Sequence, residues 1–400
     1  MRATTRPLSD FVDTTPDLND IAAGDGYLFV RNGVGVAGQG VAARVPVDEA
    51  AQFLASIEHN SSIENAGPIA LGAVPFAPQS ASEVIVPRVL VRKHPDGSAS
   101  VTLCSDVGDA EVARALAPQH PGPARSSSYE IGPLVEVDHY LAAVTAARDA
   151  VRSGALTKAV IARPISVTSS EPIDVHAVLR RLKASFGSSY RYSIDGFIGA
   201  SPELLVEVDG AVVRSHPLAG TAPRTGDVDG DAAIARDLIA STKNQVEHRI
   251  VIDVVHDTLL PWASYLDWEP EPSIVKVANV QHLGTRMEGM LSQPGPDVVE
   301  LVRALSPTPA LGGHPRDAAI ELIRKVEGFE RGLYGGAVGW VDAAGNGTWA
   351  VAIRCAELSA DRQMARLVAG GGIVADSDPT AELAETQAKF QAMLSAIIRP

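Results

Sequence analysis

Short apolar runs separated by glycine- and proline-containing turns make up most of the first 115 residues of the chain. The clearest pair of runs, at 86–93 and 98–103, flanks a Pro-Asp-Gly tripeptide at 95–97. A turn of this composition between two apolar runs predicts a β-hairpin. We therefore expect this part of the chain to form sheet scaffold, and we assign no chemistry to it.

A second hairpin is predicted near the C-terminus, where the apolar runs 338–341 and 349–356 flank a Gly-Asn-Gly turn. On a continuous strand, Arg354 would share one face with Ala350 and Ala352, because side chains alternate along a strand. A guanidinium among methyl groups needs an anionic partner when it is buried. We expect it to bind an anionic ligand, and the alternative is an edge strand with this arginine in solvent.

A further strand, expected at 364–369, runs into three consecutive glycines at 370–372. Backbone N–H groups of such a segment can approach a bound anion without obstruction by side chains. A helix is expected to follow, with Asp378 as its N-cap and Pro379 at its first position.

Apolar residues at helical spacing predict helices at 137–153, 175–186 and 231–260. Glu247, in the third of these, has apolar residues three, four and seven positions after it, so it lies on the apolar stripe of the helix. A carboxylate in that position must be neutral, paired with a cation or bound to a metal.

Glu385 and Lys389 are four positions apart in the last expected helix, which is the spacing of an ordinary salt bridge. Alternatively, Glu247 and Glu385 could both ligate a metal. Two carboxylates without a histidine or cysteine partner suit a hard cation such as Mg²⁺, which keeps several waters and accepts substrate oxygens. Lys158 and Glu203 lie on predicted strands, where each could also be a solvated surface residue.

The composition limits the classes of protein to which the chain can belong. With 46% hydrophobic residues, the 400-residue chain can bury a large core, as one big domain or two ordinary ones. The formal net charge of −14 and the lack of a basic run argue against a nucleic-acid ligand, and an anionic substrate would need local cations or a metal. Two cysteines, no recognisable secretory leader and no long apolar run predict a cytoplasmic protein without a membrane segment.

Nine ordered motifs fill the part of the chain from residue 137 to the C-terminus. They are ASPELL at 200–205, PLAGTAPR at 217–224, KNQVEH at 243–248, VQHLGT at 280–285, LSPTPALGGHP at 305–315, GLYGGAVGW at 332–340, IRCA at 353–356, AGGGIV at 369–374 and the AET of the last helix. Read together, they resemble the chorismate-utilising enzymes, a family that includes isochorismate, salicylate, anthranilate and aminodeoxychorismate synthases.

This resemblance implies an α+β fold with a single large domain over 1–400. The domain would consist of two packed, mainly antiparallel β-sheets with helices outside, as in aminodeoxychorismate synthase. Within it, 1–130 would be an N-terminal sheet scaffold and 137–400 the catalytic chorismate-binding region. Residues 117–130, rich in proline and serine, are expected to form a loop.

The resemblance also implies roles for the candidate residues. Glu203 would be the general acid that protonates the departing C4 hydroxyl of chorismate, and Lys158 the base that activates water for attack at C2. The acid must then be protonated at working pH, which requires a raised pKa, and the base must be able to lose its proton. Glu247 and Glu385 would hold Mg²⁺, and Arg354 the enolpyruvyl carboxylate. The other substrate-binding positions implied are Ala219, Gly220, Thr221, His282, Ala310, Leu311, Gly370, Gly371 and Lys389.

Three positions separate the members of the family. Ammonia-using members generally lack a lysine where this chain has Lys158, and aminodeoxychorismate-forming members carry a nucleophilic lysine where this chain has Ala219. Ala310 and Leu311 resemble the pattern of members that stop at isochorismate. We therefore predict an isomerase, an isochorismate synthase that converts chorismate reversibly for menaquinone or siderophore biosynthesis. It would act as a monomer without an amidotransferase subunit.

Three alternatives remain open. A salicylate synthase would go on to eliminate pyruvate from isochorismate, and an anthranilate-type component would use ammonium. A non-catalytic chorismate-binding protein would belong to another functional class, against which the presence of both Lys158 and Glu203 argues.

Overall fold

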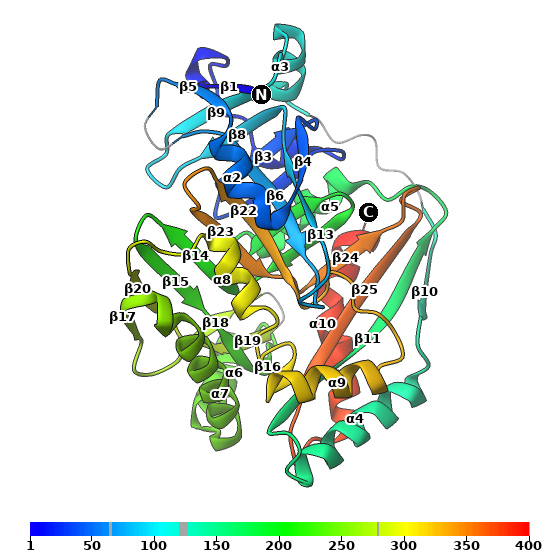
Figure 1. Cartoon of the computed structure of the whole chain (residues 1–400). Coiled ribbons are helices and arrows are strands. Elements are labelled where there is room, and N and C mark those ends of the chain that lie inside the picture. Colours follow the sequence, from blue (N-terminus) through cyan, green and yellow to red (C-terminus); the bar gives the residue numbers. More distant parts are fainter. Residues whose placement is uncertain (64–65, 120–126, 278–279, 400) are drawn as a thin grey trace.

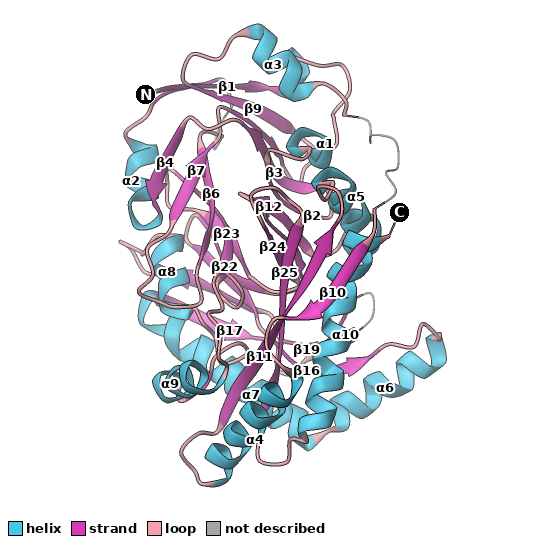
Figure 2. Cartoon of the chain, turned by 90° about the vertical axis from the view of Figure 1, so that its right-hand side faces the viewer, coloured by secondary structure: helices cyan, strands magenta, loops and turns pink. Residues whose placement is uncertain are grey.

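Two large β-sheets run through the molecule, and helices cover their outer faces (Figures 1 and 2). The computed structural model describes residues 1–63, 66–119, 127–277 and 280–399. Within these residues, thirteen strands form one sheet, nine form a second and three form a small third. The expected α+β fold with packed, mainly antiparallel sheets is confirmed.

The thirteen-stranded sheet joins strands from both ends of the chain. Its members are β10 (Tyr129–Pro133), β11 (Lys158–Ser169), β25 (Met364–Ile373), β24 (Cys355–Leu358), β13 (Phe197–Ser201), β12 (Tyr190–Ile194), β2 (Tyr27–Arg31), β3 (Val34–Gln39), β8 (Val89–Lys93), β9 (Ala99–Cys104), β1 (Arg2–Pro7), β5 (Glu58–Ser61) and the short β21 (Gly313–His314), which pairs with β11. The expected N-terminal hairpin is present as β8 and β9. The long pair β11–β25 sets Val160 opposite Gly372 and Ala162 opposite Gly370.

The other two sheets come mainly from the middle and the C-terminal part of the chain. The nine-stranded sheet contains β17 (Ala263–Trp268), β20 (Met287–Leu291), β15 (Val212–His216), β14 (Leu204–Asp209), β23 (Gly347–Val351), β22 (Ala337–Asp342), β6 (Ile69–Val74), β7 (Glu83–Val86) and β4 (Ala43–Pro46). The three-stranded sheet contains β16 (Leu218–Pro223), β19 (Val280–Gly284) and β18 (Ser273–Lys276).

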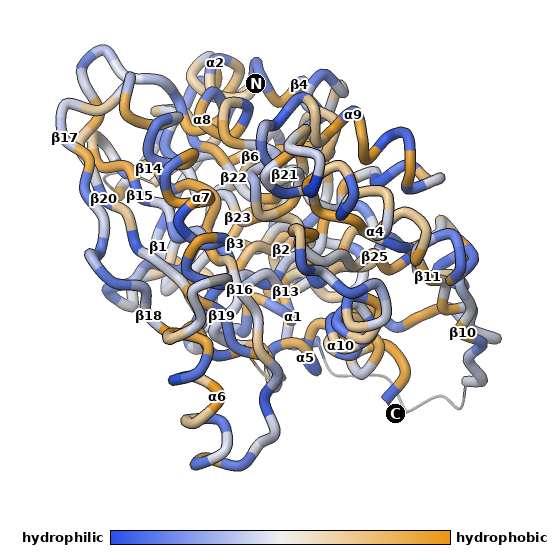
Figure 3. The backbone as a smooth tube through the Cα atoms, turned by 90° about the horizontal axis from the view of Figure 1, so that it is seen from below, coloured by the Kyte–Doolittle hydropathy of each residue, from blue (hydrophilic) through white to orange (hydrophobic). Residues whose placement is uncertain are grey.

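The helices lie around these sheets. They are α1 (Leu18–Ala22), α2 (Ala50–Ala55), α3 (Asp109–Leu116), α4 (Val137–Arg152), α5 (Val175–Phe186), α6 (Val228–Ala240), α7 (Thr242–Leu259), α8 (Val298–Leu305), α9 (Arg316–Val326) and α10 (Pro379–Ile398), with 3-10 turns at Leu8–Asp10, Val47–Glu49 and Leu260–Trp262. As expected, Asp378 caps α10 by accepting a hydrogen bond from the backbone N–H of Ala381. Seen from below, α6 projects from the body of the molecule (Figure 3).

The largest apolar cluster draws on both large sheets, with Tyr192 and Phe197 from the first and Trp349 from the second. Burial of such large side chains supplies most of the driving force that holds two sheets face to face. A second cluster lies between the thirteen-stranded sheet and helices that include α5 and α10. Because β11 and β25 contribute to these clusters, the strands that lead to the candidate site are held rigidly.

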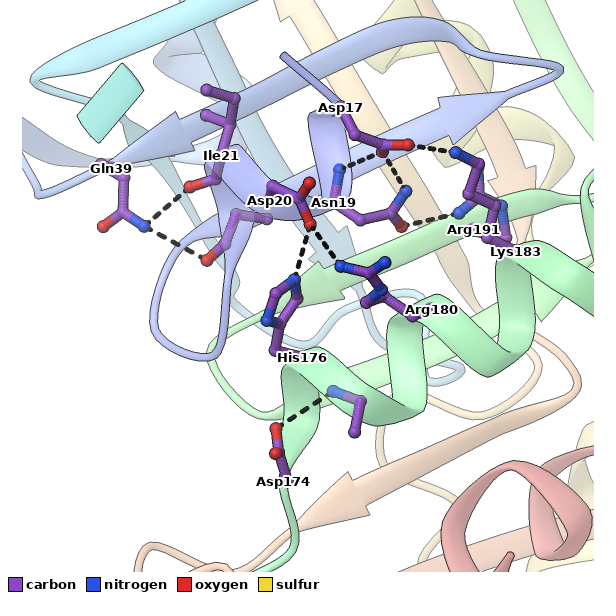
Figure 4. A network of polar contacts seen from close by, with 12 residues as sticks. Asp17, Asn19, Asp20, Ile21, Gln39, Asp174, His176, Arg180, Lys183 and Arg191 are labelled. Atoms are coloured by element: carbon purple, nitrogen blue, oxygen red, sulfur yellow. Dashed lines mark hydrogen bonds and ion pairs between the residues drawn. The ribbon is translucent and has the colours of Figure 1, made fainter. Parts of the chain in front are cut away.

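A polar network fastens α1 to α5 on the N-terminal side of the thirteen-stranded sheet (Figure 4). Arg191 of β12 donates to Asn19 Oδ1 at 2.7 Å, and Asp17 accepts from Lys183 of α5. Asp20, in turn, accepts from His176 at 2.9 Å. Every contact in this network joins scaffold elements, so we assign it a structural role.

Two expected elements are interrupted in the structure. The helix expected at 231–260 is divided into α6 and α7, because Ser241 leaves the helical conformation and its hydroxyl accepts the N–H of Asn244 to start a new helix. The strand expected at 349–356 is also wrong as one piece. Its first part, β23, pairs in the nine-stranded sheet and its second part, β24, in the thirteen-stranded sheet. Arg354 lies between them, not on a continuous strand.

The loop expected at 117–130 lies only partly within the described residues. Residues 120–126 lie outside the described part of the chain, and the last two residues of the expected loop already belong to β10. Among the described residues, none of the helices has the length and apolar character needed to cross a membrane.

Candidate active site

A cavity of about 260 Å³ lies among β11, β16, β25, α7 and α10. Thirteen of the fourteen site residues expected from the sequence lie on its wall. They are Lys158, Glu203, Ala219, Gly220, Thr221, Glu247, His282, Ala310, Leu311, Arg354, Gly370, Glu385 and Lys389. The fourteenth, Gly371, lies between the wall residues Gly370 and Gly372 but is not itself part of the wall.

Lys158 opens strand β11 and is only 1% exposed, so the solvated alternative is wrong for this lysine. Its Nζ lies 2.8 Å from Oε1 of Glu247, which reaches in from α7. A methyl group on Gly372 would lie 2.8 Å from both Glu247 Oε1 and Lys158 Cε. The bare glycine backbone therefore makes room for this buried pair.

The salt bridge expected between Glu385 and Lys389 is present, at 2.6 Å. Lys389 also donates to the carbonyl of Gly370 at 2.7 Å, and this ties α10 to β25. Both residues nevertheless line the cavity, so the pair faces a ligand space and not only solvent.

The donor set of the cavity fits a hard cation. Glu247 and Glu385 each form an ion pair with a lysine, and both carboxylates line the cavity. Over the described residues, no group of three or more histidine, cysteine, aspartate or glutamate side chains is arranged to hold a metal. A metal here would therefore have two carboxylate ligands and would need waters or substrate oxygens for the remainder, as Mg²⁺ accepts.

Glu203 lies between β13 and β14 and is 3% exposed. Burial raises its pKa to about 8, although a hydrogen bond from the backbone N–H of Leu218 and the charge of Lys158 both act to lower the pKa. This carboxyl group consequently carries a proton near neutral pH. It can therefore donate that proton to a leaving group in the cavity.

Arg354 is buried with a φ angle of 53°, a backbone conformation that costs energy for any residue except glycine. Its guanidinium makes long contacts, 3.5 Å to His282 Nε2 and 3.4 Å to the carbonyl of Lys389. Burial lowers the pKa of this arginine to about 10, so the group stays charged. Long contacts of this kind are readily exchanged for an anionic ligand.

His282 is held as a neutral ring, because burial and then the charges of Arg354 and Lys389 lower its pKa to about 3. Nε2 faces the guanidinium of Arg354 and accepts from it, which leaves Nδ1 to donate to Gly220 O at 3.3 Å or to Thr221 Oγ1 at 3.1 Å. The ring thus connects β16 to the candidate anion-binding arginine.

Part of the remaining wall is apolar. Ala310 and Leu311 lie on it beside the phenol ring of Tyr334, and Ala219 of β16 lines it too. Gly220 adopts a φ angle of 73°, which a side chain would strain, and it packs against Asn244 of α7. This part of the wall can therefore pack against the apolar atoms of a ligand.

Several wall residues were not expected from the sequence, among them Asn244, Tyr334 and Glu382. Glu382 lies one turn before Glu385 on α10, and this spacing was the signal that could have identified it. A methyl group on Gly371 would lie 2.5 Å from Glu382 Oε2, so this glycine leaves space for that carboxylate.

Comparison with known proteins identifies the family of the chain. Residues 44–398 match the family model described as chorismate binding enzyme. The isochorismate synthase DhbC of Bacillus subtilis is 38% identical over 341 residues, which cover 82% of this chain and 81% of that protein. The isochorismate synthase EntC of Escherichia coli is 34% identical, over 82% of this chain and 81% of its own length.

A solved structure extends the comparison to the whole fold. The menaquinone-specific isochorismate synthase MenF of Escherichia coli superimposes with a TM-score of 0.85 at 26% identity, covering 99% of this chain and 94% of that one. The family match begins at residue 44, so it includes much of the N-terminal part in which no motif was recognised. The chain belongs to the chorismate binding enzyme family.

Proposed function

We propose that this protein is an isochorismate synthase, which converts chorismate to isochorismate reversibly and depends on Mg²⁺. The observation that carries the proposal is that two buried groups line one cavity, the carboxyl of Glu203 with its raised pKa and the side chain of Lys158. Family membership and the isochorismate synthases among its relatives support it.

In the proposed reaction, water adds at C2 of the ring, the ring double bonds shift, and the C4 hydroxyl leaves. Hydroxide is a poor leaving group, so Glu203 donates its proton to the departing oxygen and a water molecule is released. One water is consumed and one is formed, and the net change is therefore an isomerisation. The raised pKa of Glu203 is what makes it an acid at neutral pH.

Lys158 takes the proton of the attacking water. In the structure its Nζ is paired with Glu247, and a base must have a free electron pair. We propose that Lys158 acts in the form that has this free pair, and Glu247, which lies beside it, would also be one of the two residues that hold the metal. The proton that Lys158 gains and the proton that Glu203 loses balance over one turnover.

Chorismate carries two carboxylates, and the chain offers a cationic partner for each. Arg354 would bind the enolpyruvyl carboxylate, supported by the backbone of the glycine segment at 370–372. Glu247 and Glu385 would hold Mg²⁺, which when bound would neutralise and orient the ring carboxylate. These local cations offset the repulsion that a chain with a formal charge of −14 exerts on a dianion.

The choice of nucleophile and product also follows from the wall of the cavity. Ala219 presents a methyl group, which cannot attack the ring in the way that a lysine could. Leu311 is buried and apolar, and we propose that it keeps isochorismate out of the geometry needed to eliminate pyruvate. The enzyme would act as a cytoplasmic monomer without an amidotransferase subunit, and it would serve menaquinone or siderophore biosynthesis.

The test is to incubate the purified protein with chorismate and Mg²⁺, without ammonium, and to follow the products by chromatography together with a coupled pyruvate assay. We expect isochorismate to reach a plateau beside residual chorismate, with little pyruvate. Salicylate rising in step with pyruvate would instead identify a salicylate synthase. Chorismate that binds but is never converted would identify a non-catalytic binding protein.

A further inference from the structure

Strand β11, which begins with Lys158, is not fully covered along one of its two edges. β25 pairs with it along one edge over most of its length. On the other edge, β21 pairs with Lys158 and Ala159, and β10 pairs only from Ile165 onward. Among the strands that the structure describes, none pairs with 160–164 on that edge. Buried backbone groups in such a gap need other partners.

The N–H of Val160 donates to the carbonyl of Gly312 at 3.0 Å, and the carbonyl of Pro164 accepts from the N–H of Leu134 at 3.2 Å. Between these two contacts a buried ion pair supplies partners for further backbone groups. The backbone N–H of Ala162 donates to Oε1 of Glu327 at 2.7 Å, and the carbonyl of Val160 accepts from Nη2 of Arg331 at 2.7 Å. Nε of the same arginine donates to Glu327 Oε2 at 2.8 Å. Its Nη1 donates to the carbonyl of Leu311 at 2.7 Å. One planar guanidinium therefore joins β11 to the apolar segment of the cavity wall.

Neither member of this pair lines the cavity, and both are almost completely buried, with side chains 2% and 1% exposed. Glu327 ends helix α9, and the guanidinium of Arg331 lies 4.2 Å from the ring centre of Phe76. Replacing a buried ion pair by apolar side chains of similar volume is often neutral or stabilising, so stability alone does not explain this arrangement. The fixed geometry of the pair explains the arrangement, because the planar guanidinium holds several acceptors at set positions.

We infer that Glu327 and Arg331 form a positioning element for the proposed reaction. They set the distance between β11, which carries Lys158, and the apolar part of the cavity wall at Leu311. The inference rests on the proposed function. Val160 lies two residues after Lys158 on β11, and its side chain and that of Leu311 both face the cavity. A shift of the pair would therefore move the base and the apolar wall relative to each other.

The test is Arg331→Lys, which keeps the charge beside Glu327 but replaces the planar fork by a single ammonium. That ammonium cannot reach the Val160 and Leu311 carbonyls and the carboxylate in the same geometry. We expect kcat to fall about 10- to 100-fold while KM for chorismate stays nearly constant, because misplacement of catalytic groups affects the chemical step. We also expect pyruvate to appear as a second product, which a purely structural role would not produce.

The matched control is Arg191→Lys, in the network of Figure 4. Arg191 is also buried, at 1% exposure, and donates to Asn19 at 2.7 Å, but it does not line the cavity. This variant should lose thermal stability without a change in kcat or product ratio. Should Arg331→Lys fail to fold, Glu327→Asp tests the same idea, because it keeps both charges but withdraws the carboxylate by one methylene.

The outcomes separate the two proposals. A wild-type protein that makes no isochorismate would overturn the proposed function. A wild-type protein that makes isochorismate, together with an Arg331→Lys variant whose kcat and product ratio match those of Arg191→Lys, would overturn the positioning role alone.

Discussion

Replacing Glu203 by glutamine tests its protonation in the folded protein, independently of any assay for product. Glutamine has nearly the same shape, and its amide oxygen can still accept the N–H of Leu218, but it does not titrate. Burial raises the pKa of Glu203 from 4.5 to about 8. A pKa difference of that size means that burial disfavours the ionised form of Glu203, relative to the protonated form, by about 5 kcal/mol.

The direction of the effect on stability follows from the raised pKa of Glu203. Below pH 4.5 the carboxyl is protonated in both the folded and the unfolded protein, so its ionisation does not change the free energy of unfolding. Between pH 4.5 and about 8 the unfolded state loses the proton and the folded state keeps it, so the free energy of unfolding falls by about 1.4 kcal/mol per pH unit. Above about pH 8 both states are ionised, and the loss of stability stays constant.

We therefore expect Glu203→Gln to become more stable relative to the wild type as the pH rises from about 5 to about 8. Urea denaturation of both proteins at several pH values in this range measures the difference. Glu130→Gln, at an exposed position on β10, is the control and should show no such trend. A stability difference for Glu203→Gln that does not change with pH would refute the raised pKa.

The same variant has a catalytic consequence. If Glu203 is the acid, kcat/KM of the wild type should decrease as the pH rises through about 8, because the free enzyme then loses the proton it must donate. Glu203→Gln should lose about 10²- to 10⁴-fold in kcat. Full activity in this variant would show that Glu203 is not the acid of the reaction, even if its raised pKa were verified.

Three other predictions test the remaining groups. Lys158→Gln should reduce turnover by about 10²- to 10⁴-fold while chorismate still binds in calorimetry, and an active variant would exclude lysine as the base. Glu247→Gln should weaken Mg²⁺ binding by at least about tenfold, measured by titration calorimetry without substrate, and an unchanged isotherm would leave this glutamate with only a structural role. Leu311→Ser should release pyruvate beside isochorismate in the coupled assay, and a product ratio equal to that of the wild type would contradict its part in excluding elimination.

Local sequence signals predicted the elements whose ends are set by nearby residues. The turn at 95–97 marked a hairpin, and Asp378 marked the start of α10, because a turn or a cap is made by side chains within a few residues. The same reasoning failed at Ser241 and Arg354. Around Arg354 the apolar run continues while the chain passes from one sheet to the other, and periodicity carries no information on that change. At Ser241 the segment 241–245 is polar, and the serine starts a second helix as its N-cap.

The sequence by itself determined the ordered motifs, because their residues and spacing are written in the order of the chain. Through the resemblance of these motifs to a known family, the α+β class and thirteen residues on the cavity wall could be predicted. Only the tertiary structure decided which charges from distant parts of the chain meet. Lys158 pairs with a glutamate 89 positions away in the chain. Burial in the folded protein raises the pKa of the Glu203 carboxyl. The contacts of the Glu327–Arg331 pair with β11 depend on the gap along that strand. Such a gap exists only once the sheet has formed.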